Sequence, residues 1–382
     1  MRIISIGLYN PIPIKSGVDS YITSLLNPLG KNNDVIHYYF YQSLEEKGHR
    51  PKEIFFKTEY LKSEIIKKFS GQHKLVQLLR PDLLVDKRPL KNIVADIVVC
   101  DAFTFHAGRY VSKINKSPLI LIKHNIEWKY LQSDRSYAYI FLKAYEHHIL
   151  RKANAIITIS MSDYHYFAEY VDEKRIYYIP PNLNTDIFKP DGASYDFGSD
   201  KFNLLFYGSL DRPMNIAALK FIKYSLLPLL KELNLLDKIR MNIFGSGIPP
   251  ESLKLREDEN INYLGPVDDP GKYIRGADLV IIPVINPGGI KIRILEVLFC
   301  GRSMIVTPEV SVGLPDEFKK FVYVEKDVEG FLKVIKLFLD GAEVKKINTS
   351  RIKEYVSKSI TMYDVIDNLF NIGKSIREDN GR

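Results

Sequence analysis

The stretch VINPGGIKIRILEVLFCG, residues 284–301, lies between two apolar runs and contains the glycine pair Gly288-Gly289, two cations and one carboxylate. The glycines let the backbone approach a ligand closely. A helix that starts after them has unpaired N–H groups and a partial positive charge at its first turn, which together bind anions. Lys291 and Arg293 in that turn oppose the helix dipole, so a phosphate ligand accounts for both. Glu296, one turn later, could accept hydrogen bonds from sugar hydroxyls. The same residues also fit an ordinary loop with two solvated cations.

Two further turns of similar composition follow other apolar runs. In GSLDRPMN, residues 208–215, Gly208 ends the run, Arg212 lies in the loop, and the Asn215 side chain could cap the next helix. In FGSGIPP, residues 244–250, the glycines suit the close passage of a base or a ribose. Such turns are where doubly wound sheets bind ligands.

The turn NPIPIKSGVDS, residues 10–20, joins the first apolar run to its helix and contains Lys15, Ser16 and Gly17. A dinucleotide-binding fingerprint needs three spaced glycines here, and they are missing. Redox chemistry with a dinucleotide therefore loses its main support. The sequence also lacks the spacing of a zinc site, a Ser-His-acid set and a paired-carboxylate hydrolase signature, so neither a metal nor hydrolysis is expected.

His124 ends the apolar run PLILI, which places it at the carboxyl end of a predicted strand, facing a cleft rather than the core. A lone histidine at such a place can equally be structural. Trp128, the only tryptophan, is expected to pack rather than to stack on a ligand. Basic charge is present, but no nucleic-acid module with interleaved aromatic residues accompanies it, so nucleic acid is not an expected partner.

Short apolar runs alternate with helical ones along the chain and then restart, which predicts two doubly wound α/β domains in tandem with a cleft between them. The expected strands are 2–8, 35–41, 96–100, 118–124, 155–160 and 176–180 in the first half, and 202–208, 241–245, 261–265, 278–284, 303–308 and 321–326 in the second.

The polar stretch 191–200 is predicted to be a linker. The expected domains are residues 1–187 and 201–360, followed by 361–382, whose amphipathic helix is one more than the second domain needs and could pack back on the first. Segment 44–90 fits the alternation poorly: it is either a helical insertion or a basic surface for an acceptor or a membrane.

Chain length, cysteine positions and charge limit the number of domains, the cellular location and the class of partner. The 382 residues suffice for two cores, and no apolar run is long enough to span a bilayer. Two cysteines, Cys100 and Cys300, lie in different halves, so a reducing cytoplasm is the default location. Residues 1–187 hold 26 Lys and Arg against 19 Asp and Glu, whereas residues 188–382 hold 28 against 27. A basic first half favours an anionic partner such as a membrane surface, or is simply a solvated basic surface.

Taken in order, these motifs resemble the retaining, nucleotide-sugar-dependent glycosyltransferases of family four (glycosyl transferases group 1), which have the GT-B fold of two Rossmann-like domains. The resemblance covers nearly the whole chain. PGGIKIRILEVLFCGRSMIVTP is similar to the family's donor-binding loop and helix, and LLFYGSLDRPMNIAALKFI to its phosphate loop. MNIFGSG, INYLGPVDD and IRGADLVIIP are similar to the segments around the nucleotide, and KHNIEW to a His-Asn-x-Glu stretch of some members.

This resemblance implies a role for each matching residue. Glu296 would hold the ribose hydroxyls, and His124 would contact the donor sugar. Other donor-binding residues would be Gly288, Gly289 and Ile290 through their backbone, Gly208 and Ser209 in the phosphate loop, Gly245 beside the nucleotide, Arg293, and Gly17 closing on the diphosphate from the first domain.

Two departures from the family's pattern bear on catalysis. Many members carry a second glutamate eight positions before the ribose-binding one, and here that position is Gly288. Many also carry Arg and Lys after the phosphate-loop glycine, where this chain has Ser209 and Met214. Lys291 and Arg212 are the expected substitutes for the missing positive charge, with Arg293 as a third candidate.

The implied reaction moves a sugar from a nucleoside diphosphate, which is a donor substrate and not a cofactor, to a hydroxyl of a glycan or lipid-linked acceptor with retention of configuration. Cations and helix N–H groups would stabilise the leaving diphosphate without a metal. A polyprenyl-phosphate-linked acceptor would place the protein at the inner face of the membrane. The alternatives are a catalytically silent donor-binding or partner subunit of the same fold, and a nucleotide-sugar epimerase.

Overall fold

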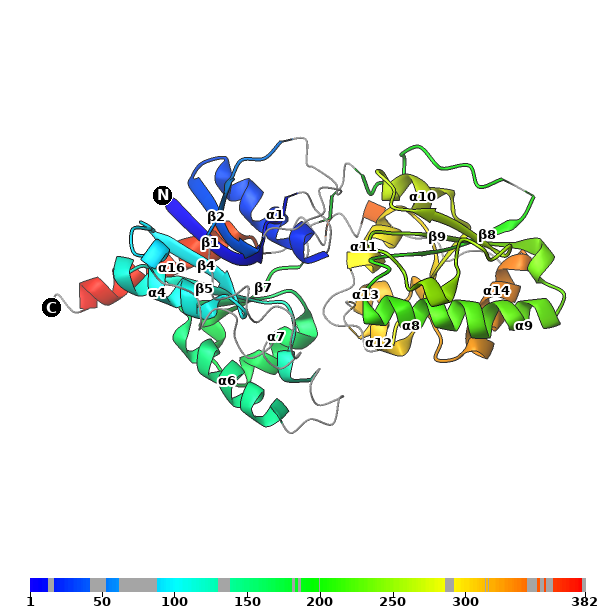
Figure 1. The fold of residues 1–382 in the computed structure, drawn as a ribbon. Helices are drawn as coiled ribbons and strands as arrows, with labels where there is room; N and C mark the ends of the chain where they lie inside the picture. The colour runs from blue at the N-terminus through cyan, green and yellow to red at the C-terminus, as the bar shows by residue number, and fades with distance from the viewer. Residues whose placement is uncertain are drawn as a thin grey trace. The chain divides into compact units, whose positions relative to one another are not determined.

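The computed structural model describes residues 1–12, 17–41, 53–61, 88–129, 138–180, 183–184, 187–198, 200–285, 292–312, 314, 316–341, 349–350, 354 and 360–379. Contacts within the chain divide it into two compact units (Figure 1). Unit 1 comprises Met1–Asn182 together with Ser359–Arg382, and unit 2 comprises Leu183–Lys358. Most of segment 44–90 lies outside the described residues, as do Lys15 and Ser16.

Within its described residues, unit 1 is built on one parallel sheet of seven strands in the order β3-β2-β1-β4-β5-β6-β7. All five residues of β5 are buried, as expected for a strand of a parallel sheet covered on both faces. The strands are β1 Arg2–Tyr9, β2 Asp34–Tyr41, β3 Lys57–Tyr60, β4 Ile97–Asp101, β5 Leu119–Lys123, β6 Ala155–Thr158 and β7 Ile176–Tyr178.

Successive residues of β5 enter two different cores, one on each face of the sheet. Leu119 and Leu121 pack with α4 (Phe105–Asn115), α6 (Ala138–Lys152) and α7 (Met161–Ala168). Ile120 and Ile122 pack with α1 (Gly17–Gly30) and α16 (Met362–Asp379). The two faces of β5 therefore direct side chains to two separate helical layers.

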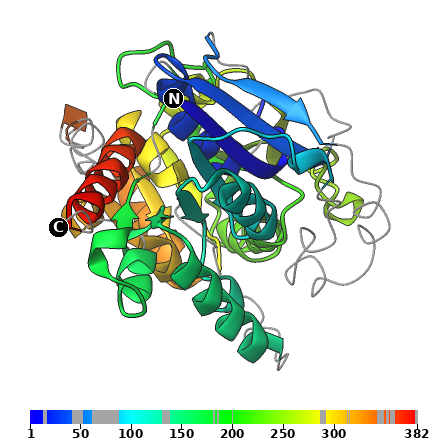
Figure 2. The same cartoon turned by 90° about the vertical axis from the view of Figure 1, so that its left-hand side faces the viewer.

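Helix α16 completes the core of unit 1 although it comes from the far end of the chain (Figure 2). Val365 and Ile366 are buried in the same cluster as Tyr21, and the Tyr363 hydroxyl donates a hydrogen bond of 2.9 Å to the carbonyl of Pro28. The expectation that the last helix packs back on the first domain is confirmed.

Unit 2 has a second parallel sheet, of six strands within its described residues, in the order β10-β9-β8-β11-β12-β13. Its strands are β8 Phe202–Tyr207, β9 Ile239–Phe244, β10 Ile261–Gly265, β11 Leu279–Ile282, β12 Met304–Val306 and β13 Val322–Val324. Its helices include α8 Pro213–Phe221, α9 Leu227–Glu232, α10 Pro270–Gly276, α11 Ile292–Phe299, α12 Pro308–Ser311, α13 Asp316–Lys319 and α14 Val328–Leu339. Two doubly wound parallel sheets confirm the predicted fold class.

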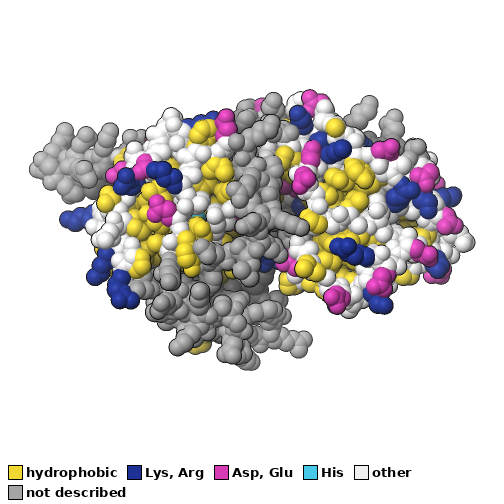
Figure 3. All heavy atoms as spheres, turned by 45° about the horizontal axis from the view of Figure 1, so that its top comes forward, with side chains coloured by type: hydrophobic (Ala, Val, Ile, Leu, Met, Phe, Trp, Pro, Cys, Tyr) yellow, Lys and Arg dark blue, Asp and Glu magenta, His cyan; other side chains and the backbone are white. Residues whose placement is uncertain are grey.

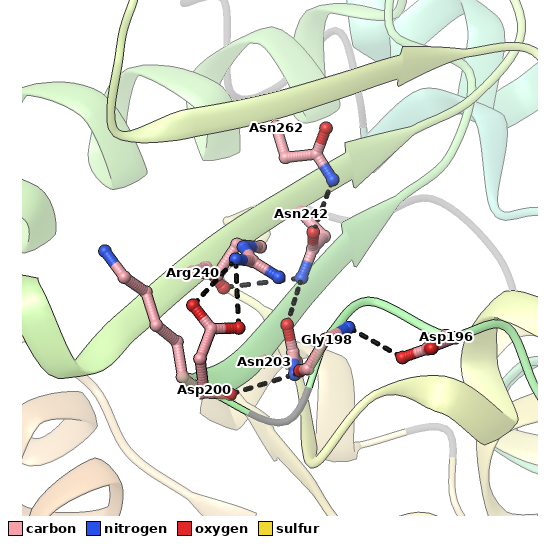
Figure 4. Close-up of polar contacts among 8 residues, drawn as sticks. Asp196, Gly198, Asp200, Asn203, Arg240, Asn242 and Asn262 are labelled. Carbon is pink, nitrogen blue, oxygen red and sulfur yellow. Dashed lines mark hydrogen bonds and ion pairs between the residues drawn. The ribbon is translucent and has the colours of Figure 1, made fainter.

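A ladder of three asparagines crosses β8, β9 and β10 (Figure 4). Asn262 donates to Asn242 Oδ1 at 2.8 Å, and Asn242 donates to Asn203 Oδ1 at 3.3 Å. Asn203 in turn donates to the carbonyls of Gly198 and Lys201 at 3.0 Å. Because a one-residue slip of any strand would turn its asparagine to the other face, the ladder fixes the register of these strands and the entry of the chain into β8.

The chain that precedes β8 is held to unit 2 by a buried arginine of α10. Arg275 donates to the carbonyls of Ile187, Lys189 and Ala193 at 2.8–3.0 Å, and Phe197 is buried in the core of unit 2. The stretch predicted as a linker is therefore packed onto unit 2 along part of its length. No helix among the described residues has the length and hydropathy to cross a bilayer.

Candidate functional site

The described candidate site of unit 2 lies at the carboxyl ends of β8 and β9, where the turns that follow them meet the first turn of α11. Gly208 directly follows β8 and has φ 153°, in the range that favours glycine. A Cβ at Gly245 would lie 1.8 Å from the carbonyl oxygen of Gly208, and the amide of Leu210 donates to the carbonyl of Ser246 at 2.7 Å. The two turns therefore touch backbone to backbone, which only glycine at 245 allows.

Arg293 joins α11 to the turn after β8. Its guanidinium donates to the carbonyl of Tyr207 at 2.6 Å and to Asn215 Oδ1 at 3.0 Å. The Asn215 amide donates to the carbonyl of Ser209 at 2.8 Å. A Cβ at Gly208 would lie 2.7 Å from Arg293 Nη1. The Arg293 side chain thus points toward the predicted phosphate loop and holds it through hydrogen bonds to Tyr207 and Asn215.

Asn215 does not cap its helix as the sequence suggested. Helix α8 starts at Pro213, and Arg212 is its N-cap residue without a side-chain capping hydrogen bond. Proline at the first position lacks an N–H that would need a cap. The Asn215 side chain is therefore available to link Arg293 to Ser209, whereas Arg212 is exposed at the loop.

Glu296 lies one turn after Arg293 and receives a hydrogen bond of 2.8 Å from the Tyr207 hydroxyl. Burial raises the pKa of Glu296 from 4.5 to about 7, against the opposing effects of the Tyr207 hydrogen bond and the Arg293 charge. Tyr207 stacks on Phe244 with ring centroids 5.0 Å apart, which fixes its ring. The carboxylate is thus held in one direction and changes charge near neutral pH.

Tyr207 was not singled out from the sequence. The sequence signal for Tyr207 is its position as the last residue of a buried strand, directly before Gly208. Its side chain meets α11, the helix that follows the neighbouring strand β11. Gly288, Gly289, Ile290 and Lys291 lie outside the described residues. Gly17 begins α1, and the structure describes nothing of its surroundings.

His124 belongs to unit 1, where it directly follows β5. Its side chain is 7% exposed and meets the Tyr21 ring edge-on at 5.9 Å. Neither ring nitrogen has a hydrogen-bond partner within the described part of the chain. Burial, with a smaller effect of the neighbouring Lys123, lowers the pKa of His124 to about 4, so the ring is neutral at pH 7.

A search of the described residues finds no group of three His, Cys, Asp or Glu side chains placed to hold a metal ion. Cys100 and Cys300 are both buried, and neither forms a disulfide. Burial raises the pKa of Cys300 to about 12, which keeps it a thiol. Neither cysteine has the exposed, electropositive setting of a reactive thiolate.

Residues 201–340, which contain every described group of the unit 2 site, match the family model of glycosyl transferases group 1. The chain carries a glycosyl transferases group 1 domain. No curated protein matches the sequence.

Several solved structures share the fold of this chain over all or nearly all of their length. Sucrose-phosphate synthase from Thermosynechococcus elongatus has a TM-score of 0.70 at 13% identity, with all of both chains covered. HepE from Anabaena in complex with UDP-glucose has a TM-score of 0.61 at 13% identity, covering 99% of this chain and 100% of that one. WaaG, a glycosyltransferase involved in lipopolysaccharide biosynthesis, has a TM-score of 0.65 at 16% identity, covering 96% and 98%. The fold is GT-B.

The raised pKa of Glu296 predicts a pH-dependent stability. Between pH 4.5 and 7 the folded state binds more protons at this carboxyl than the unfolded state does, so the stability it confers is present below 4.5 and lost as the pH rises through 7. Glu296→Gln removes this titration and keeps an oxygen for Tyr207. We expect the variant to gain melting temperature over the wild type at pH 8 and to differ little at pH 5.

The exposed Glu232→Gln in α9 is the matched control and should give the same small difference at both pH values. Thermal unfolding followed by circular dichroism measures these differences. An offset between Glu296→Gln and wild type that is equal at pH 5 and pH 8 would contradict the assignment of this titration.

Proposed function

We propose that this protein is a retaining glycosyltransferase that moves a sugar from a nucleoside-diphosphate sugar to a hydroxyl of a glycan or lipid-linked acceptor. The observation that carries the proposal is the carboxylate of Glu296, oriented by Tyr207 beside the Arg293-braced turn of Gly208, in a group 1 domain. HepE, which has the same fold, is solved with UDP-glucose bound, and this supports a nucleotide-sugar donor.

In the proposed complex the ribose hydroxyls donate to Glu296, which requires its carboxylate form. The backbone of Gly288, Gly289 and Ile290 faces the donor sugar and phosphates. Gly208, Ser209 and Gly245 line the nucleotide, and Gly17 closes on the diphosphate. Because Gly208 and Gly245 already touch each other, their first task is to bring two turns close enough to offer backbone N–H groups to one ligand.

Catalysis in this proposal is electrostatic. As the bond between sugar and diphosphate breaks, the sugar becomes oxocarbenium-like and negative charge grows on the leaving oxygen. Lys291, Arg212 and the N–H groups at the start of α11 stabilise that charge, so no metal is required. Arg293 adds charge from beneath the turn while it orients the turn through Tyr207 and Asn215.

The acceptor hydroxyl attacks from the face that the diphosphate leaves, and its proton passes to the departing diphosphate oxygen. This retains the configuration and needs no nucleophile from the enzyme. His124, neutral at pH 7, contacts the donor sugar: one ring nitrogen accepts a hydrogen bond from a hydroxyl and the other donates one.

A second candidate function is a donor-binding or partner subunit without turnover. Gly288, Ser209 and Met214 favour it, because they stand where many family members have the charged residues named above. A nucleotide-sugar epimerase of the same fold is a third candidate function. The experiment described next distinguishes all three.

The experiment is a thermal-shift panel of UDP-, GDP-, ADP- and TDP-sugars, followed by product analysis with the sugar that stabilises most. We expect a rise in melting temperature, because a ligand that binds only the folded state stabilises it. With an acceptor we expect transfer with the anomeric configuration retained, measured by NMR. Stabilisation without any turnover would favour the silent subunit, a new nucleotide sugar formed without acceptor would favour the epimerase, and no stabilisation would contradict donor binding.

The substitute cations give a second prediction. Lys291→Ala and Arg212→Ala should each lower kcat at least about tenfold with a smaller change in KM, because both cations act on charge that develops in the transition state. Lys220→Ala, which removes an exposed cation of α8, is the control and should leave kcat unchanged. Steady-state kinetics measure both constants, and wild-type turnover in both variants would refute the assignment.

We also propose that the protein works in the cytoplasm, at the inner face of the membrane, through its basic first half. This proposal is supported by the charge balance, since residues 1–187 hold 26 Lys and Arg against 19 Asp and Glu, whereas residues 188–382 hold 28 against 27. In Figure 3 the Lys and Arg side chains on the visible part of the N-terminal unit lie at separate points, with some Asp and Glu among them. Sedimentation with phosphatidylglycerol vesicles should therefore occur at low salt and be lost as the salt rises. Equal binding to neutral phosphatidylcholine vesicles would argue against this location.

A further inference from the structure

One oxygen atom, Oε1 of Glu146, holds both ends of the turn that follows β5. It accepts a hydrogen bond from Lys123 Nζ at 2.6 Å and another from the backbone N–H of Glu127 at 3.1 Å. These two donors stand four residues apart and enclose residues 124–126. Glu146 comes from α6 and is 1% exposed, and the Lys123 side chain is completely buried.

This anchor sets the direction of His124 through the alternation of side chains along a strand. Lys123 enters the layer of α6 and α7, where its ammonium also lies 5.5 Å from the centre of the Phe167 ring. His124, the next residue, enters the opposite layer and meets Tyr21 of α1. Fixing Lys123 on one face therefore fixes His124 on the other.

The enclosed turn contains buried polar atoms that have no hydrogen-bond partner among the described residues. Both ring nitrogens of His124 and Oδ1 of Asn125 are buried and make no hydrogen bond within the described residues. An unsatisfied buried polar atom costs about 1–3 kcal/mol, so a fold keeps several together where a ligand or water pairs with them. A neutral imidazole offers one donor and one acceptor, and Asn125 Oδ1 a second acceptor, which together match the hydroxyl groups of a sugar.

Stability alone does not explain the buried ion pair between Lys123 and Glu146. A buried pair must recover the desolvation of both charges, and well-packed apolar residues commonly do as well. Burial lowers the pKa of Lys123, but Glu146 and Glu127 outweigh this effect and raise it overall, so the lysine stays charged. What apolar residues could not supply is an acceptor for the Glu127 N–H at the far end of the turn.

We propose that Glu146 is a positioning residue, which holds residues 124–126 in the conformation that binds sugar hydroxyls, and that Asn125 joins His124 in contacting them. This inference rests on the proposed function and gives a role to two residues, Glu146 and Asn125, to which the sequence analysis assigned none. The hydroxyls belong to the donor sugar or to the acceptor sugar, which the experiment distinguishes.

The test compares Glu146→Ala, Glu146→Gln and Asn125→Ala with the wild type. Calorimetry measures Kd for UDP and for UDP-glucose, or for the pair that the thermal-shift panel selects. In a second arm, methyl glycosides are titrated into the protein saturated with UDP. We expect Glu146→Ala to weaken binding in one arm about tenfold, the effect of losing one or two hydrogen bonds, with Kd for UDP within about twofold of wild type. Glu146→Gln, which keeps an acceptor oxygen, should lose less.

A matched control is Asn115→Ala. Asn115 also anchors a loop of unit 1 from a helix, accepting from the amide of Ala95 at 3.1 Å and donating to the carbonyl of Ile93 at 2.8 Å, but at the amino edge of the sheet. We expect it to lower the melting temperature and to leave both binding arms unchanged. This control separates positioning from a general loss of stability.

A loss for UDP-glucose but not UDP assigns the turn to the donor sugar, and a loss confined to the glycosides assigns it to the acceptor. Should Glu146→Ala not fold, unchanged affinities in both Glu146→Gln and Asn125→Ala would overturn the inference, as would a Glu146→Ala protein that only melts earlier. A wild-type protein that binds no member of the nucleotide-sugar panel would overturn the proposed function and this inference with it.

Discussion

The described part of the unit 2 site depends on the hydrogen bond from Arg293 to the carbonyl of Tyr207. This bond ties the end of β8 to the first turn of α11 across 86 residues of sequence. Tyr207 can reach Glu296, and Gly208 can lie against Gly245, only while these elements keep their spacing. A guanidinium suits the task because its planar fork serves a carbonyl and an amide oxygen at once, and it remains charged although burial lowers the pKa of Arg293.

Each unit holds a turn with a hydrogen-bonded cation at the carboxyl edge of its parallel sheet. In unit 2 this cation is the half-buried Arg293 at the start of a helix, and in unit 1 it is the fully buried Lys123 at the end of a strand. In unit 2 the cation bonds the carbonyl of Tyr207, directly before the turn. In unit 1 it bonds Oε1 of Glu146, which also accepts from the turn's Glu127 N–H. Rigid elements thereby position loops, which by themselves have too few contacts to hold one conformation.

Much of the fold follows from local pattern. Buried parallel strands are apolar over their whole length, so runs such as that of β5 could be predicted from composition. Strand β3 escaped prediction because it is an edge strand with alternating exposed residues and carries Lys57 and Glu59. The direction of Arg293 escaped it too, since the helix dipole argues only for an anion nearby and the partners, Tyr207 and Asn215, are distant in sequence. The role of Glu146 could not be predicted either, because the residues that it contacts, Lys123 and Glu127, are distant from it in sequence.

The placement of α16 has a consequence for synthesis. The layer of unit 1 that contains Tyr21, Leu26 and Ile122 is closed by Val365 and Ile366, which leave the ribosome after the whole of unit 2. The first unit to be translated is therefore the last whose core can close, and a nascent chain carries an open apolar layer while unit 2 folds. Chaperones that bind exposed apolar segments of nascent chains would therefore have their longest-lived binding site in unit 1 of this protein.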